Sequence, residues 1–184
     1  QLNRRDLSAA LPADDLTLKA ARLLQAESRC ALGADISIDK RVPWAAGLGG
    51  GSSDAASTLL VLNRLWGLHW PRERLLPLAQ RLGADVPFFV GGRNAFVEGI
   101  GEHLTPIDVP RQWLAVVKPA AGLATADVFT HPALVRDTPS AILAGFLAEA
   151  TQPGFWQRAW GRNDLQPPAE DRCPEVAQAT RWLQ

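Results

Sequence analysis

Glycines and serines crowd one short stretch of the chain, just before a predicted helix. The stretch reads P-W-A-A-G-L-G-G-G-S-S-D-A-A from Pro43 to Ala56. Glycines allow a positive φ and a close approach of the backbone to a ligand, and the first turn of a helix carries unpaired N–H groups and a partial positive charge. Together they predict an anion site, where the Ser52 and Ser53 hydroxyls could bind a phosphate or a magnesium ion. The simpler alternative is a flexible turn capped by Ser52.

The loop differs from the two commonest phosphate-binding motifs. A Walker A loop has Lys after its last glycine, where this chain has Ser52. The Rossmann fingerprint needs a strand that leads directly into G-x-G-x-x-G within a βαβ repeat. Here Pro43 interrupts the approach, and the downstream sequence does not alternate in that way. The pattern therefore indicates a phosphate site of another kind.

One carboxylate downstream of the loop is a candidate catalytic group. Asp85 lies between a predicted helix end at Gly83 and an apolar segment from Val86 to Val90. A side chain at such an element end is partly desolvated. Phosphoryl transfer to a hydroxyl needs a group that accepts the proton, so Asp85 could act as a general base. The alternative is an aspartate that caps a helix or forms a salt bridge.

The elements that must position these groups follow from hydrophobic periodicity. We expect helices over 12–32, 52–66 and 71–82, a strand over 34–39, and a hairpin that pairs 86–90 with 94–98. Beyond Gly99 the pattern predicts a buried strand over 114–117 and mostly helical segments over 125–129, 140–150, 155–159 and 174–183. The chain is therefore expected to be an α+β protein in two parts, 1–98 and 99–184.

Composition excludes several classes of protein. The 184 residues include 19 Lys plus Arg and 19 Asp plus Glu, so the formal net charge is zero and no nucleic-acid surface is indicated. No apolar run is long enough for a bilayer. Cys30 and Cys173 form no C-x-x-C pair, which favours two free thiols and a cytoplasmic location. Because the chain starts at Gln1 and has no Met, we expect it to be part of a longer protein.

The glycine loop resembles the second motif of the galactokinase, homoserine kinase, mevalonate kinase and phosphomevalonate kinase superfamily. Four more stretches are similar to the branch of that superfamily that acts on 4-diphosphocytidyl-2-C-methyl-D-erythritol in the non-mevalonate isoprenoid pathway. They are I-S-I-D-K-R-V-P from Ile36, L-G-A-D-V-P-F-F from Leu82, F-V-E-G-I-G-E from Phe96 and G-R-N-D-L from Gly161.

This resemblance implies a fold and a reaction. Residues 1–98 would be part of an ATP-binding domain like ribosomal protein S5, and residues 99–184 part of a ferredoxin-like domain on the substrate side. ATP and Mg²⁺ are the implied cofactors. The implied reaction transfers the γ-phosphate of ATP to the 2-hydroxyl of the cytidine-diphosphate-linked methylerythritol. The implied protein is a monomer or homodimer without nucleic-acid or membrane partners.

The resemblance also assigns roles to single residues. Asp85 matches the catalytic base and contacts the substrate, and Thr125 and Phe129 match a substrate-side pair, with Phe129 stacked on the cytosine. Asp15 replaces an Asn that faces the adenine in close relatives, and a carboxylate cannot donate a hydrogen bond as an amide does. Ser53 is also expected to bind the metal. The residues expected to bind ATP are Lys40, Pro43, Gly47, Leu48, Gly49, Gly50, Gly51, Ser52 and Ser53.

Alternatives remain open for some residues and for the function. Lys40 could be a solvated surface lysine and Phe129 a core side chain. The chain could come from another kinase of the superfamily, of the homoserine or mevalonate type. It could also bind a nucleotide without catalysis, because the superfamily's lysine-bearing first motif and third glycine motif are expected outside this sequence.

Overall fold

The computed structural model describes residues 1–8, 10–43, 46–111, 113–150, 152 and 161–183, and it has the predicted α+β character. The chain divides into two compact units. The first comprises Gln1–Trp44 and Leu48–Asp108, and the second comprises mainly Val109–Gln184. None of the described helices combines the length and the apolar character that a membrane span requires.

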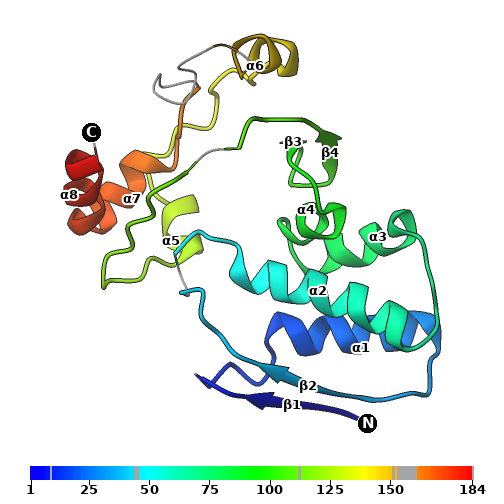
Figure 1. Cartoon of the computed structure of the whole chain (residues 1–184). Coiled ribbons are helices and arrows are strands. Elements are labelled where there is room, and N and C mark those ends of the chain that lie inside the picture. The colour runs from blue at the N-terminus through cyan, green and yellow to red at the C-terminus, as the bar shows by residue number, and fades with distance from the viewer. Residues whose placement is uncertain (9, 44–45, 112, 151, 153–160, 184) are drawn as a thin grey trace. The chain divides into compact units, whose positions relative to one another are not determined.

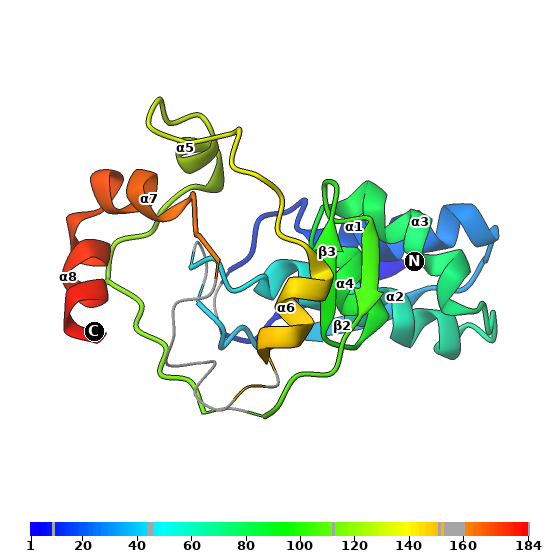
Figure 2. The same cartoon turned by 90° about the horizontal axis from the view of Figure 1, so that it is seen from above.

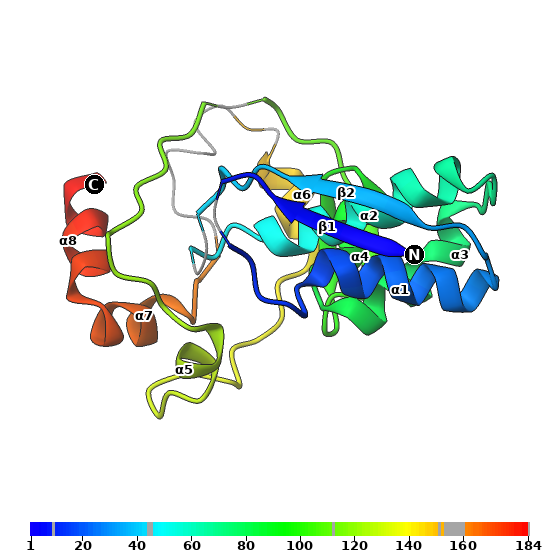
Figure 3. The same cartoon turned by 90° about the horizontal axis from the view of Figure 1, so that it is seen from below.

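The first unit is built on two parallel strands, β1 (Leu2–Asp6) and β2 (Ala34–Ile38), which pair in register from Leu2 opposite Ala34 to Asp6 opposite Ile38. Helix α1 (Leu16–Ser28) connects them, and α2 (Gly50–Leu65) follows β2. Figures 1 and 3 show α1 and α2 on the same face of this sheet. Strand β2 confirms the predicted strand. Strand β1 was not predicted, because Leu2 is its one apolar residue.

The core of the first unit lies around α2. Helix α2 packs against α1 and against α4 (Val86–Gly91), and α4 in turn packs against α3 (Arg72–Leu82). Burying a large aliphatic side chain stabilises the fold by about 1.5–3 kcal/mol. The core thus fixes α2, and with it the loop that leads into this helix. The largest fully buried aliphatic side chains of this core are Leu24, Leu59, Leu75, Val86 and Val90.

The predicted strand over 86–90 is wrong, and so is the hairpin built on it. Residues Val86–Gly91 form α4, which has Pro87 in its first turn and ends at Gly92 with a φ of 67°. Proline lacks the N–H that a sheet ladder needs but suits the first turn of a helix. The hairpin instead pairs β3 (Ala95–Glu98) with β4 (His103–Pro106), close to α4 in Figure 2.

The observed helix boundaries differ from the predicted ones where capping groups define them. Helix α1 starts after Asp15, not at Pro12, because the Asp15 carboxylate accepts a hydrogen bond from the Leu18 N–H at 3.1 Å. It ends before Arg29, which has a φ of 52°. Helix α2 starts at Gly50, two residues earlier than expected. Helix α3 confirms the predicted helix over 71–82, with Pro71 as its N-cap.

The second unit contains four described helices: α5 (Thr125–Phe129), α6 (Leu143–Ala150), α7 (Gln166–Arg172) and α8 (Pro174–Leu183). The segments over 125–129 and 174–183 are confirmed as helices, α6 begins three residues later than expected, and α7 was not predicted. The helix expected over 155–159 lies outside the described residues.

The buried strand expected over 114–117 is wrong. Residues Leu114 and Val116 are 75% and 68% exposed and have no regular structure, since no described strand pairs with them. The prediction of two free thiols is confirmed, because neither Cys30 nor Cys173 forms a disulfide.

Candidate active site

The first turn of α2 carries the N–H groups that an anion would need. Gly49 is the N-cap, with a φ of 63° and no side-chain cap. The first bond inside the helix runs from the Ser53 N–H to the Gly49 carbonyl at 2.9 Å. The N–H groups of Gly50, Gly51 and Ser52 precede it and have no acceptor among the described residues. Because Gly49 is the cap, the alternative of a turn capped by Ser52 is wrong, and three donors remain available for a ligand.

Side chains from other elements enclose this turn. A Cβ added to Gly49 would lie 2.9 Å from Cε2 of Phe89 on α4, and a Cβ on Gly50 would lie 3.0 Å from Nζ of Lys40 and 3.2 Å from Cγ1 of Val42. The contact with the Phe89 ring is closer than a Cβ normally allows, so position 49 needs glycine for close packing and for the positive φ. The contacts at Gly50 are tight, and a Cβ there would require Lys40 and Val42 to shift by a few tenths of an ångström.

Lys40 lies at the amino end of α2 and is not a solvated surface lysine. Its ammonium forms an ion pair with Asp54, and its side chain is only 10% exposed. The ammonium also lies beside Gly50, so it adds a positive charge next to the free N–H groups. Asp54 was not predicted as a site residue. The loop motif contains it, but the sequence gives no sign that it pairs with a lysine fourteen residues earlier.

Asp85 lies at the amino end of α4, in the N-cap position, with an exposed side chain. Its carboxylate makes no side-chain cap, and no described residue pairs with it. Phe89 is one helical turn further on, about 6 Å along the axis at about 1.5 Å per residue, and its ring touches Gly49. Asp85 and Phe89 are four residues apart and therefore lie on the same side of α4, the side whose Phe89 ring approaches Gly49, although the element is a helix and not the expected strand.

The rest of the predicted ATP loop is more open. Pro43, Gly47 and Leu48 are exposed, and Ser52 and Ser53 are partly buried. Gly47 has a φ of 68°. The two serine hydroxyls have no hydrogen bond to another described residue, which leaves them available to a ligand.

Asp15 forms an ion pair with Arg4, an arginine that is partly buried. Its Oδ1 lies 2.7 Å from Nη1 of Arg4, whose Nε lies 2.8 Å from Oδ1 of Asp6. Burial lowers the pKa of the Arg4 guanidinium, but hydrogen bonds and charge attraction to Asp15 and Asp6 raise it more, so the net shift is upward. The same Asp15 oxygen caps α1. These bonds give Asp15 a role in anchoring α1 to β1.

The predicted substrate residues belong to the second unit. Thr125 begins α5 and Phe129 ends it, one turn later. Phe129 is 53% exposed, so the alternative of a core phenylalanine is wrong. In the same unit, His131 Nε2 lies 3.0 Å from Asp171 Oδ2 and joins the segment after α5 to α7.

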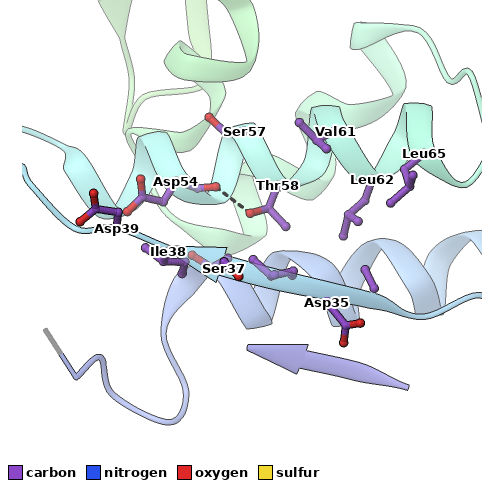
Figure 4. Close-up of a pocket in the computed structure, with 13 residues that line it drawn as sticks. Asp35, Ser37, Ile38, Asp39, Asp54, Ser57, Thr58, Val61, Leu62 and Leu65 are labelled. Atoms are coloured by element: carbon purple, nitrogen blue, oxygen red, sulfur yellow. Dashed lines mark hydrogen bonds between the residues drawn. The ribbon is translucent and has the colours of Figure 1, made fainter. Parts of the chain in front are cut away.

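A pocket of about 440 Å³ lies along α2 and β2 and is lined by none of the predicted site residues. Figure 4 shows Asp39 and Asp54 at one end of it and Leu65 at the other. Both carboxylates are paired with cations, Asp54 with Lys40 and Asp39 with Arg41. No group of three His, Cys, Asp or Glu side chains that could hold a metal ion exists among the described residues.

Known proteins match this arrangement. Residues 15–93, which span α1 to α4, match the family model described as "GHMP kinases N terminal domain". Residues 15–93 are thus similar to the N-terminal domain of GHMP kinases. The predicted resemblance is thereby confirmed at the level of the superfamily, and the first turn of α2 lies inside the matched segment.

The wider comparisons extend the GHMP kinase likeness over the whole chain. It is 63% identical over 184 residues to the 4-diphosphocytidyl-2-C-methyl-D-erythritol kinase of Methylibium petroleiphilum, of which it covers 62%. It is 52% identical to the kinase of that name from Variovorax paradoxus, of which it covers 64%. A crystal structure of 4-(cytidine 5'-diphospho)-2C-methyl-D-erythritol kinase matches with a TM-score of 0.75 and 31% identity, over 97% of this chain and 63% of that one. The chain thus spans less than two thirds of the length of these relatives.

Proposed function

We propose that the full-length protein transfers the γ-phosphate of ATP to the 2-hydroxyl of 4-diphosphocytidyl-2-C-methyl-D-erythritol. The relatives named above carry this substrate in their names, and the match covers the entire chain. The observation that carries the proposal is the first turn of α2, where three free N–H groups and the Lys40 ammonium converge inside a GHMP kinase domain.

The phosphates of ATP bind at the amino end of α2 in this proposal. The N–H groups of Gly50, Gly51 and Ser52 donate to phosphate oxygens, and the helix dipole adds a partial positive charge. Glycines at 49 and 50 allow the Phe89 ring and the Lys40 ammonium to come close to this turn. Pro43, Gly47 and Leu48 form the outer part of the nucleotide site.

Lys40 and Ser53 take complementary roles in the same site. Lys40 keeps its ammonium beside the phosphates through the ion pair with Asp54. Ser53 offers a hydroxyl to Mg²⁺, which binds mostly to water and to phosphate oxygens and needs few protein ligands. That chemistry fits a site without a dedicated cluster of carboxylates, and bound Mg²⁺ would neutralise charge on the triphosphate.

Asp85 is the general base of the proposed reaction. Its carboxylate accepts the proton of the substrate hydroxyl while that oxygen forms a bond to the γ-phosphorus and the bond to the β–γ bridging oxygen breaks, with ADP as the leaving group. Its freedom from other described partners leaves it able to accept that proton.

The remaining parts of the proposal concern the substrate side and the protein as a whole. Thr125 and Phe129 bind the cytidyl substrate, and the exposed Phe129 ring offers a face for the cytosine. Residues 1–98 serve the nucleotide and residues 99–184 the substrate. The protein works in the cytoplasm as a monomer or homodimer.

A coupled assay of ADP release from the full-length protein tests this function. With ATP, Mg²⁺ and the cytidyl substrate we expect turnover, and none with homoserine or mevalonate. Turnover of homoserine or mevalonate in preference to the cytidyl compound would overturn the substrate assignment. Asp85→Asn should lower kcat by at least about 100-fold, the usual scale for a lost general base. Wild-type turnover by this variant would overturn the role of Asp85.

A further inference from the structure

We propose that the turn between β3 and β4, which reads E-G-I-G-E from Glu98 to Glu102, positions Asp85 for the reaction. Gly101 and Glu102 are its positioning residues. The sequence analysis singled out this motif, but none of its residues belongs to the predicted site. The inference rests on the proposed role of Asp85 as the general base.

The turn is closed by its own carboxylate. Oε2 of Glu102 accepts a hydrogen bond from the Ile100 N–H at 2.6 Å, and the Gly101 N–H donates to the Glu98 carbonyl at 3.3 Å. Hydrogen bonds from the backbone N–H groups of Glu102 and Ile100 hold the pKa of the Glu102 carboxyl below its usual value. Near neutral pH the carboxylate is therefore charged and holds the turn in one shape.

Gly101 brings this turn against the backbone that precedes Asp85. It has a φ of 117°. A Cβ added there would overlap the Ala84 carbonyl oxygen and lie 2.9 Å from the Ala84 carbonyl carbon. Because that carbonyl belongs to the peptide unit joining Ala84 to Asp85, the turn contacts the backbone at the start of α4. A side chain at position 101 would have to displace one of the two backbones.

The position of Asp85 depends on contacts of its backbone with other segments, because its own side chain makes no contact with the described residues that would fix it. The carboxylate caps no N–H group of α4 and pairs with no described residue. One side of its backbone is fixed by the buried Val86 and by the Val86 N–H, which donates to the Gly83 carbonyl at 3.2 Å. On the other side, the Gly101 backbone lies against the Ala84 carbonyl and limits movement of the peptide unit that joins Ala84 to Asp85. Since a misplacement of about 1 Å can cost about 100-fold in rate, this contact bears directly on turnover.

The chain offers a matched control for a substitution at Gly101. Gly67 follows α2, has a φ of 68°, and has no atom within 4 Å of an added Cβ. Gly67→Ala therefore introduces left-handed backbone strain in open space, while Gly101→Ala, at a φ of 117° outside the left-handed helical region, combines a larger backbone strain with the collision with Ala84. An effect of Gly101→Ala on kcat beyond that of Gly67→Ala reports on the geometry of the turn at Gly101, and the Asp85→Asn background shows whether that effect acts through Asp85.

The test is a double-mutant cycle in the full-length kinase. We expect Gly101→Ala to lower kcat by about 10- to 100-fold and to change the KM for ATP by less than about twofold, while Gly67→Ala keeps its kcat. In the Asp85→Asn background, Gly101→Ala should cost no more than Gly67→Ala does, because the displaced carboxylate is already absent. Glu102→Gln, which keeps the glycines, should lower kcat by a few fold without changing the KM for ATP.

The outcomes separate this inference from the function on which it rests. If Asp85→Asn lowers kcat but Gly101→Ala behaves like Gly67→Ala, the positioning role is wrong. The same holds if Gly101→Ala still lowers kcat in the Asp85→Asn background. If Gly101→Ala fails to fold, Glu102→Gln decides, and a wild-type kcat in that variant overturns the proposal. Wild-type turnover by Asp85→Asn would instead overturn the function of Asp85 itself.

Discussion

Gly49 offers the sharpest test of the nucleotide site, because one added methyl group changes both its backbone and its packing. Gly49→Ala forces alanine to a φ of 63° and places its Cβ 2.9 Å and 3.0 Å from two ring carbons of Phe89. We expect the first turn of α2 to shift away from α4. The phosphate donors of that turn should then be misplaced.

The expected loss of stability in Gly49→Ala follows from two separate free-energy costs. A non-glycine residue in the left-handed region costs about 1–2 kcal/mol, which Gly67→Ala should show by itself. Overpacking against Phe89 adds about 1–3 kcal/mol at Gly49. The free energy of unfolding should thus fall by about 1–3 kcal/mol more in Gly49→Ala than in Gly67→Ala. If about half of the overpacking, about 0.5–1.5 kcal/mol, appears as displacement of the loop from its ATP-binding position, ATP affinity should fall about 2- to 12-fold, since 1.4 kcal/mol corresponds to a factor of ten.

The assay combines urea denaturation with calorimetric titration of Mg²⁺-ATP into the full-length protein. A second substitution, Phe89→Leu, removes the ring from the contact and should restore part of the lost affinity in the Gly49→Ala background. Equal stability and equal ATP affinity of Gly49→Ala and Gly67→Ala would refute the reasoning. The reasoning would also be refuted if Phe89→Leu restored no ATP affinity in the Gly49→Ala background.

Three further predictions concern charges. Arg4→Met should lower the free energy of unfolding by about 1–3 kcal/mol, because it leaves two partly buried carboxylates without their partner. Adding Asp15→Asn should restore part of this loss, and strict additivity of the two substitutions in urea denaturation would contradict the pairing. Lys40→Met should weaken ATP binding by about 10- to 100-fold, since a hydrogen bond to a charged group contributes about 1.5–3 kcal/mol. Asp54→Asn keeps the ammonium and should weaken binding less, and the reverse order in calorimetry would contradict these roles. The pKa of Glu102 is lowered by bonds from backbone N–H groups, so its stabilisation of the turn is present above the ordinary value of 4.5 and is lost as pH falls through the folded-state pKa. As the pH falls, the rate of amide hydrogen exchange in the turn should therefore increase relative to the rate in a Glu102→Gln variant. Exchange rates that change with pH in the same way in both proteins would contradict this prediction.

The parts of the site that could be predicted from the sequence are local ones. The glycines and serines before α2 follow one another directly, so their type and spacing define the loop without knowledge of the fold. Strand β2 shows clear alternation, and α3 has Pro71 in front of it. Each of these signals lies within one turn or strand, which is why they were recognised.

Other parts depend on contacts between distant segments. Strand β1 holds a partly buried Arg4 in ion pairs with Asp6 and Asp15, so the inward face of this strand does not appear apolar in the sequence. A short apolar run such as Val86–Gly91 fits a buried strand or a buried helix equally well, and the packing of α4 on α2 decides between them.

A structure of the full-length protein with Mg²⁺ and a non-hydrolysable ATP analogue would test the central claim most directly. The claim is that the amino end of α2 holds the ATP phosphates beside Asp85. It predicts that phosphate oxygens accept hydrogen bonds from the N–H groups of Gly50, Gly51 and Ser52 at about 2.7–3.2 Å, with the Asp85 carboxylate facing the γ-phosphate. A triphosphate bound elsewhere, with these N–H groups facing water, would contradict it.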